Sequence, residues 1–284
     1  MSQQKYDFII VGCKYPQHSK PPPHPTNTIT AGPAGSLLAN RLANTTAHPS
    51  ILLLEAGPAS EPSNTNYLSD RFMSFMAHPN LNWQYKTIPQ THLNNRALDY
   101  SRGRGLGGST AINFAAYTVG PKDDYDRWAE LVGDDFFNWE NSVRRRKTFE
   151  NYTFDVKDKQ YQKYYQPEKS LHGENGELYV SVPDVWEDSM TTLLDAAEGV
   201  EGMGICKDIN DGVAFGLSAV PATAKAARRE TAATAFLKDV PKNLEIVSET
   251  VVQRVLFEGT RAVGVLTNNG ECKKGLQFEV ITKD

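Results

Sequence analysis

The chain has 284 residues, enough for one large or two smaller domains, and a net charge of −4 at pH 7. This mildly acidic balance, without a long basic block, argues against a nucleic-acid partner. Three cysteines without C-x-x-C spacing indicate neither a disulfide framework nor a zinc site. A polar N-terminus, and no apolar run of about 20 residues, predict a soluble cytoplasmic protein without a secretory signal or membrane contact.

Two halves of a dinucleotide-binding turn stand apart near the N-terminus. Tyr6–Gly12 (YDFIIVG) predicts a strand that ends in glycine, and Gly32–Ser36 (GPAGS) opens an amphipathic helix. Joined through one residue, they would form a G-x-G-x-x-G fingerprint, in which backbone N–H groups at a helix N-terminus meet a pyrophosphate. The length of this turn is part of its chemistry, and Cys13–Ala31 interrupts it.

The composition of Cys13–Ala31 (CKYPQHSKPPPHPTNTITA) sets this segment apart from the rest of the chain. It holds five of the sixteen prolines and two of the six histidines, and it has no helical or strand periodicity. Synonymous codons allow a splice donor at Cys13–Tyr15, a branch point at Thr26–Thr28 and an acceptor at Thr30-Ala31. Excision between them would leave VGSGPAGS, with correctly spaced glycines. We therefore hypothesise a retained intron, and a genuine surface loop at a turn tip is the alternative.

Two segments beyond the first helix carry further signs of a nucleotide site. Ser50–Gly57 (SILLLEAG) predicts a strand buried on both faces of a parallel sheet. Its Glu55 follows Gly35 by twenty residues, where a Rossmann-type unit places the carboxylate that binds the adenosine ribose. Tyr100–Val119 is dense in small residues, which let backbone approach a flat ligand closely. The apolar residues after its glycines indicate packing into a core rather than a flexible loop.

The middle of the chain predicts a helix at Pro121–Leu131 and an exposed excursion at Asn151–Ser170. The tyrosines of this excursion either pack on the surface or line a substrate channel. The basic run Arg144–Lys147 (RRRK) is interpreted as the solvated face of a helix rather than a binding patch.

The following segment, Leu171–Pro183, predicts a hairpin, and its His172 is interpreted as structural. We expect helices at Asp184–Val200 and Ala224–Leu237. Three strands should follow as a meander with turns at Glu258-Gly259 and Asn269-Gly270: Leu244–Val247, Val251–Phe257 and Ala262–Leu266.

Four segments, in order, resemble the glucose–methanol–choline (GMC) family of FAD-dependent oxidoreductases. The most specific is GRGLGGSTAINFAAYTVGPKDDYDRWAEL, Gly103–Leu131, which is similar to the first signature of the family. The others are NWQYKTIPQ, LHGENGELYVSVP, and ARRETAATAFL with NLEIVSETVVQRVLFEGTRAVGV. The resemblance covers almost the whole chain outside Cys13–Ala31.

The resemblance implies an α/β fold: a Rossmann-like FAD-binding domain with part of an inserted α+β substrate domain. Residues 1–150 would be the first part of the FAD-binding domain, with 13–31 as an anomalous insert. Residues 151–223 would be a partial substrate-domain excursion, and residues 224–284 the return to the FAD-binding domain. Because family members are about twice as long, the C-terminal half is expected to be missing.

The resemblance also assigns cofactor contacts and an activity. The reaction is oxidation of a small alcohol, in which a base removes the hydroxyl proton and hydride passes to the flavin. Ile112 stands where some members carry a flavin-linked histidine, so FAD should bind non-covalently. The expected FAD contacts are Gly12, Gly32, Ala34 and Gly35 at the pyrophosphate; Glu55 and Ala56 at the ribose; Leu106, Gly107, Gly108, Ser109, Asn113, Phe114, Ala115 and Ala116 at the flavin; and Val252 at the adenine.

Three functional readings follow for the chain. None of its six histidines matches the catalytic base of the family, so we expect an FAD-dependent enzyme in an inactive, truncated form. The alternative is a non-catalytic remnant that binds flavin, a nucleotide or a partner protein. An NAD-dependent dehydrogenase is disfavoured, because such an enzyme has no need of the second glycine-rich segment at Gly103–Asn113.

Overall fold

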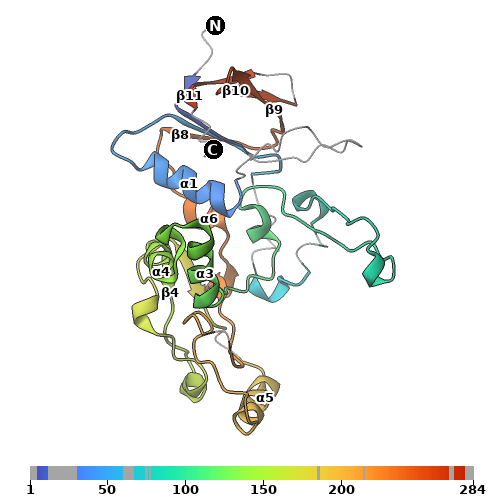
Figure 1. The fold of residues 1–284 in the computed structure, drawn as a ribbon, viewed down its shortest axis with the longest axis vertical. Coiled ribbons are helices and arrows are strands. Elements are labelled where there is room, and N and C mark those ends of the chain that lie inside the picture. The colour runs from blue at the N-terminus through green and yellow to red at the C-terminus, as the bar shows by residue number, and fades with distance from the viewer. Residues whose placement is uncertain are drawn as a thin grey trace. The chain divides into compact units, whose positions relative to one another are not determined.

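The computed structural model describes residues 5–11, 31–59, 67–73, 76, 78–183, 186–213, 215–268 and 272–278. The chain forms two compact units (Figure 1): unit 1 is Met1–Phe114 with Thr231–Asp284, and unit 2 is Ala115–Glu230. The boundaries expected at residues 150 and 223 concern the domains of the family and stay predictions. The predictions on residues 12–30 lie outside the described residues.

A parallel three-stranded sheet forms the centre of unit 1. Its order is β2 (Phe8–Val11), β3 (Ile51–Leu54) and β8 (Leu244–Val247), with Phe8 opposite Ile51 and Ile51 opposite Leu244. All four residues of β3 are fully buried. A central parallel strand has apolar neighbours on both faces, as the continuous run ILLL predicted.

The two faces of this sheet pack against different layers. On one face, Ile10, Ile51 and Leu53 share a core with Ala39 and Ala43 of α1 (Pro33–Ala43). On the other face, Leu52 and Leu54 share a core with residues of a second sheet. This division follows from the two-residue period of a strand, and it confirms the predicted α/β fold class and the predicted first helix.

The second sheet of unit 1 has the order β1-β11-β10-β9. The strands are β1 (Lys5–Tyr6), β9 (Val252–Glu258), β10 (Arg261–Thr267) and β11 (Cys272–Phe278). The predicted meander was wrong in one respect, since β8 pairs with β3 in the other sheet. The chain leaves the parallel sheet after β8 at Glu249, whose φ is +52° and whose N–H donates to the Gly57 carbonyl at 2.8 Å. The expected turn at Asn269-Gly270 lies outside the described residues.

The described residues of unit 2 include a sheet of order β4-β5-β6-β7 and the helices α3, α4 and α5. Helices α3 and α5 confirm the predictions at 121–131 and 184–200. Within the described residues, no helix of either unit is long and apolar enough to cross a membrane. The elements are β4 (Glu150–Tyr152), β5 (Leu178–Ser181), β6 (Ala222–Lys225), β7 (Arg228–Arg229), α3 (Lys122–Val132), α4 (Trp139–Arg146) and α5 (Asp188–Glu198).

Several predictions for unit 2 were wrong. The tyrosines expected at the surface (Tyr152, Tyr161, Tyr164 and Tyr165) are buried in its main core, where Tyr161 stacks on Trp186 at 4.7 Å. The expected hairpin at 171–183 does not form, since β5 pairs in parallel with β4 and antiparallel with β6. Of the basic run, Arg146 is buried, and its Nε lies 3.1 Å from Glu150 Oε1.

The predicted helix at 224–237 was wrong in its first half. Residues 222–229 form the hairpin of β6 and β7, closed by Ala226 (φ +47°) and Ala227 (φ +60°). Two consecutive positive φ values are typical of the type I′ turn that joins two strands. Within that predicted range only Ala232–Phe236 is helical (α6), and its N-cap is Thr231, whose hydroxyl accepts from the Thr234 N–H.

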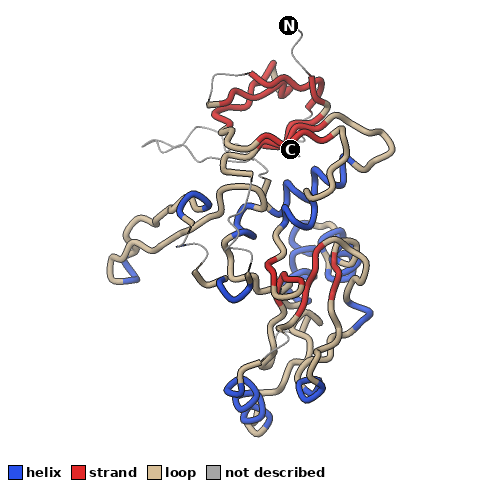
Figure 2. The backbone as a smooth tube through the Cα atoms, turned by 180° about the vertical axis from the view of Figure 1, so that it is seen from behind, coloured by secondary structure: helices blue, strands red, loops and turns tan. Residues whose placement is uncertain are grey.

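Much of the chain between residues 78 and 107 is loop, drawn tan in Figure 2. Isolated bridges pair its two arms at Asn82–Gly103, Lys86–Asp99 and Gln90–Arg96. Seven short 3-10 helices occur in the described parts of the two units: Leu68–Asp70, Pro79–Leu81, Thr91–Leu93, Gly108–Ala111, Asp135–Phe137, Lys159–Lys163 and Lys169–Leu171.

Candidate cofactor site

Glycine-containing segments from three parts of unit 1 meet backbone to backbone. The N–H of Gly107 donates to the Ala31 carbonyl at 2.8 Å, and a Cβ on Gly108 would lie 2.7 Å from the Gly32 Cα. A Cβ on Gly57 would lie 2.4 Å from the Gly105 nitrogen. Because only glycine permits such approaches, the start of α1, the end of β3 and the 103–108 loop converge.

The start of α1 suits a phosphate group. Gly32 is the N-cap and Pro33 occupies the first turn, and the cap makes no side-chain hydrogen bond. Backbone N–H groups and the positive end of the helix dipole at such a terminus attract an anion. Of the predicted pyrophosphate contacts, Gly32 and Gly35 are buried here, Ala34 is exposed, and Gly12 lies outside the described residues.

Glu55 lies buried at the carboxyl end of β3. Its Oε1 accepts from the N–H of Gly57 at 3.0 Å and from the N–H of Gly105 at 2.9 Å. Burial raises the pKa of this carboxyl above its ordinary value, although the backbone N–H groups of Gly57, Gly105, Ala31 and Ala56 oppose the rise. The carboxylate therefore ties the strand end to the glycine-rich loop, and its contact to a ribose stays a prediction.

We expect Glu55→Ala to destabilise the chain even without a ligand. The substitution leaves the buried N–H groups of Gly57 and Gly105 without their carboxylate acceptor, which costs about 2–4 kcal/mol in unfolding free energy. The matched variant Glu55→Gln keeps an acceptor oxygen and should lose less than half of that. Urea unfolding of the three proteins without added nucleotide measures both effects. Equal losses in the two variants would contradict this role.

The predicted flavin segment continues from this loop. Gly107 (φ +87°) caps the short helix Gly108–Ala111, and the Ser109 hydroxyl accepts from the Gly103 N–H at 3.0 Å. Thr110 Oγ1 donates to the Gly107 carbonyl at 2.5 Å and accepts from the N–H of Ala232, the first residue of α6, at 2.9 Å. The segment is thus closed on itself through Ser109 and held to α6 of unit 1 through Thr110.

A cavity of about 500 Å³ opens along this segment in unit 1. Its walls include the predicted residues Ser109, Asn113 and Phe114, with Ile112 at the same place. Asp99, Ser101 and Arg102 also line it, and sequence reasoning missed them. These three belong to the long loop before the glycines, where no periodic pattern marks the side chains that line the cavity.

The remaining predicted contacts lie elsewhere. Leu106 packs at the edge of the core that contains Ile10 and Ala31, and Ala56 is buried at the end of β3. The side chain of Val252, in β9, packs in the core between the two sheets, so any adenine contact would come from its backbone. Ala115 and Ala116 belong to unit 2: the Ala115 carbonyl accepts from the Thr223 N–H at 2.9 Å, and Ala116 bridges Ala222.

A parallel sheet, a helix N-terminus and a strand-end carboxylate in this arrangement are typical of dinucleotide-binding α/β proteins. A model of the family described as GMC oxidoreductase matches residues 28–283, so the chain belongs to the GMC oxidoreductase family. Enzymes of this family use FAD and oxidise alcohols and related CH–OH substrates. The glycine packing and the buried carboxylate fit such a cofactor.

Two curated relatives illustrate the similarity. An alcohol dehydrogenase [acceptor] from Pseudomonas putida is 35% identical, over 98% of this chain and 44% of its own length. An oxygen-dependent choline dehydrogenase from Pectobacterium carotovorum is 30% identical, over 96% of this chain and 44% of its own length. The chain therefore spans less than half the length of these relatives.

Solved structures show the same fold. The pyridoxine 4-oxidase from Mesorbium loti matches with a TM-score of 0.78 and 23% identity, covering 95% of this chain and 48% of that one. An FAD-dependent oxidoreductase from Chaetomium thermophilum matches with a TM-score of 0.77 and 25% identity, covering 93% of this chain and 42% of that one.

Proposed function

We propose that the protein carrying this chain oxidises an alcohol with non-covalently bound FAD, and that these 284 residues supply most of the FAD site. The observation that carries the proposal is the packing of the α1 terminus, Glu55 and the Gly103–Phe114 segment in unit 1. Bound FAD would supply the hydride acceptor for the CH–OH donor. Alcohols, choline and sugars, which name the relatives, are the substrate classes to test.

The residues of the chain would act by holding and orienting the cofactor. N–H groups at the start of α1 would bind the pyrophosphate, and the Glu55 carboxylate would accept from the ribose hydroxyls. Ser109, Asn113 and Phe114 would shape the cavity on the flavin side. The aliphatic side chain of Ile112 offers no nucleophile, which supports non-covalent binding.

We also propose that the 284-residue chain alone binds FAD without turnover. No histidine of the sequence matches the catalytic base of the family. His172 lies in unit 2, and its ring nitrogens face two carboxylates.

Anaerobic flavin reduction tests both the proposed alcohol oxidation and the proposed FAD binding without turnover. The protein is purified with FAD, and its visible flavin absorbance is followed after addition of a simple primary alcohol, choline or a pyranose. We expect acid precipitation to release FAD into the supernatant, as non-covalent binding requires. One substrate class should bleach the flavin of the longest polypeptide that contains this sequence. The 284-residue chain should remain yellow. Bleaching by NADH but by no alcohol would overturn the proposal, and so would a protein that binds no FAD in either form.

A further inference from the structure

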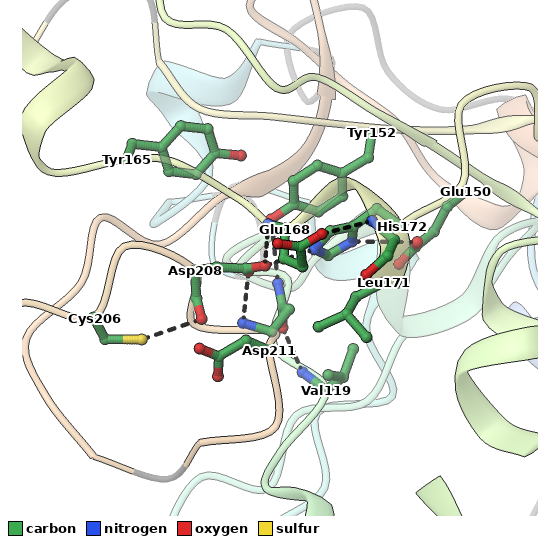
Figure 3. Close-up of polar contacts among 12 residues, drawn as sticks. Val119, Glu150, Tyr152, Tyr165, Glu168, Leu171, His172, Cys206, Asp208 and Asp211 are labelled. Atoms are coloured by element: carbon green, nitrogen blue, oxygen red, sulfur yellow. Dashed lines mark hydrogen bonds and ion pairs between the residues drawn. The ribbon is translucent and has the colours of Figure 1, made fainter. Parts of the chain in front are cut away.

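Unit 2 contains a buried cluster of four charged side chains drawn from separate segments. The charge cluster consists of Arg146 at the end of α4, Glu150 in β4, His172 after the Lys169–Leu171 turn, and Asp208 in the 206–212 loop. All four are less than 9% exposed. Figure 3 shows the ring of His172 between the carboxyl groups of Glu150 and Asp208.

Both ring nitrogens of His172 face a carboxylate oxygen. Nε2 lies 3.0 Å from Asp208 Oδ2, and Nδ1 lies 3.4 Å from Glu150 Oε2, an ion-pair separation longer than a hydrogen bond. A neutral imidazole has one N–H and one lone pair, so it would present that lone pair to one of the two carboxylates. An imidazolium presents an N–H to each. The arrangement therefore fits the protonated ring.

The charge count leads to the same state. Arg146 Nε lies 3.1 Å from Glu150 Oε1, so one cation already balances one of the two carboxylates. With His172 protonated the cluster is neutral, whereas with His172 neutral it carries one uncompensated negative charge away from water. An unbalanced buried charge is expensive, because low-dielectric surroundings cannot solvate it.

Among the described residues, the other groups around the ring do not supply a substitute cation. Tyr152 stacks on the ring at 3.7 Å, and the Tyr117 hydroxyl donates to Glu150 Oε1 at 2.5 Å. The Glu168 carboxylate caps Ser170 nearby, and its own N–H donates to Asp208 Oδ2 at 3.1 Å. Lys169 lies over the ring of Phe154, 5.3 Å from its centre, and Phe154 meets the imidazole edge-on.

The charge cluster also holds the 206–212 loop in place. Asp208 Oδ1 accepts from the Asn210 N–H at 2.9 Å, and Asn210 Oδ1 accepts from the Val119 N–H at 2.9 Å. Val119, Arg146 and Tyr117 line a cavity of about 410 Å³ in unit 2. Contacts to His172 therefore extend through the 206–212 loop to one wall of this cavity.

We propose that protonated His172 is a pH-gated lock in unit 2: charged, it holds the 206–212 loop against β4, and on losing its proton to solvent it releases that loop. The lock differs from the proposed FAD chemistry and does not depend on it. Deprotonation leaves one of the two carboxylates facing a lone pair and the cluster with one uncompensated negative charge, so the loop and its contact to Val119 become the weak point of the unit.

The sign of the pH dependence follows from the electrostatics. Burial alone would lower the pKa of His172, but Asp208 and Glu150 together outweigh it and raise the pKa above its ordinary value of 6.5. A raised pKa in the folded state means that the stabilisation is complete below pH 6.5. It decreases as the pH rises from 6.5 to the folded-state pKa, and it is lost above that value.

Titration of the histidine ring by NMR on the full chain tests the lock directly. The signal of His172 is identified by its absence in His172→Gln and by the ring-current shift from Tyr152. We expect its pKa above 6.5, and a lower pKa in Asp208→Asn, where one carboxylate charge is gone. A wild-type pKa at or below 6.5, or no decrease in Asp208→Asn, would overturn the proposal. Because the wild-type pKa alone can overturn the proposal, the test holds even where a variant fails to fold.

Thermal unfolding against pH supplies the second readout. The wild-type Tm should fall as the pH rises from 6.5 through the folded-state pKa, whereas the Tm of His172→Gln should stay level over the same interval. His92→Gln, which removes an exposed histidine of unit 1, is the matched control and should follow the wild type. A His172→Gln curve that falls in parallel with the wild type would show that His172 is merely structural.

Discussion

Excision of residues 13–30 is expected to raise the affinity of the chain for FAD by at least about tenfold. The shortened sequence reads Gly12-Ala31-Gly32-Pro33-Ala34-Gly35, which restores the G-x-G-x-x-G spacing. One regained hydrogen bond between a backbone N–H and a phosphate oxygen contributes about 1.5–3 kcal/mol, and about 1.4 kcal/mol is tenfold in affinity.

The structure indicates where the excision should stop. Ala31 is fully buried, and its carbonyl accepts from the Gly107 N–H at 2.8 Å and from the Ser36 hydroxyl at 2.9 Å. Ala31 therefore already occupies the place of the single residue before Gly32. Replacing Cys13–Ala31 by one serine, the outcome of the hypothesised splicing, should perform equally well.

A length-matched control separates spacing from composition. In that control, residues 13–30 are replaced by an equally long Gly/Ser segment, and FAD affinity is measured by flavin fluorescence quenching for all forms. We expect the control to bind as weakly as the parent chain. If the shortened chain shows no gain in FAD affinity, the interrupted turn is not what limits FAD binding. Transcript sequencing across codons 12–32 then tests the retained-intron hypothesis separately from the binding chemistry.

The sequence predicted the parts of the fold that rest on local periodicity. The run ILLL identified a central parallel strand, and the spacing after Gly32 identified α1, because burial follows the period of the element in both. The cofactor contacts assigned to Glu55 and to the Gly103–Gly108 loop stay predictions. The structure adds that the loop binds Glu55 directly, through the N–H of Gly105.

The errors fall where tertiary context overrides local pattern. The alanines around Ala226 favour a helix by propensity, yet the strand pairing of β6 with β7 requires a turn at that point. Polar composition predicted exposure near Tyr165, but its hydroxyl donates to the Thr153 carbonyl at 3.1 Å, so the ring can be buried. Arg146 is buried because Glu150, four residues later in β4, supplies the opposite charge.

Gly108→Ala is expected to lower both FAD affinity and stability, because two separate constraints act at this residue. Its φ is +55°, where a Cβ costs about 1–2 kcal/mol. The added Cβ would also lie 2.7 Å from the Gly32 Cα, and displacing packed backbone costs about a further 1–3 kcal/mol. The displacement falls where the α1 terminus meets the flavin segment, so we expect FAD affinity to drop about a hundredfold, equivalent to about two lost hydrogen bonds.

Gly259→Ala is the matched control for this substitution. Gly259 lies in unit 1 with φ +63°, close to that of Gly108, but its Cβ would meet nothing within 4 Å. Backbone strain alone should therefore lower the free energy of unfolding by about 1–2 kcal/mol and leave FAD affinity unchanged. Urea unfolding and FAD titration of the two variants separate strain from close packing. Equal losses in both would mean that the contact between Gly108 and Gly32 carries no weight in the site. A loss of affinity confined to Gly108→Ala would show that this backbone contact positions the cofactor.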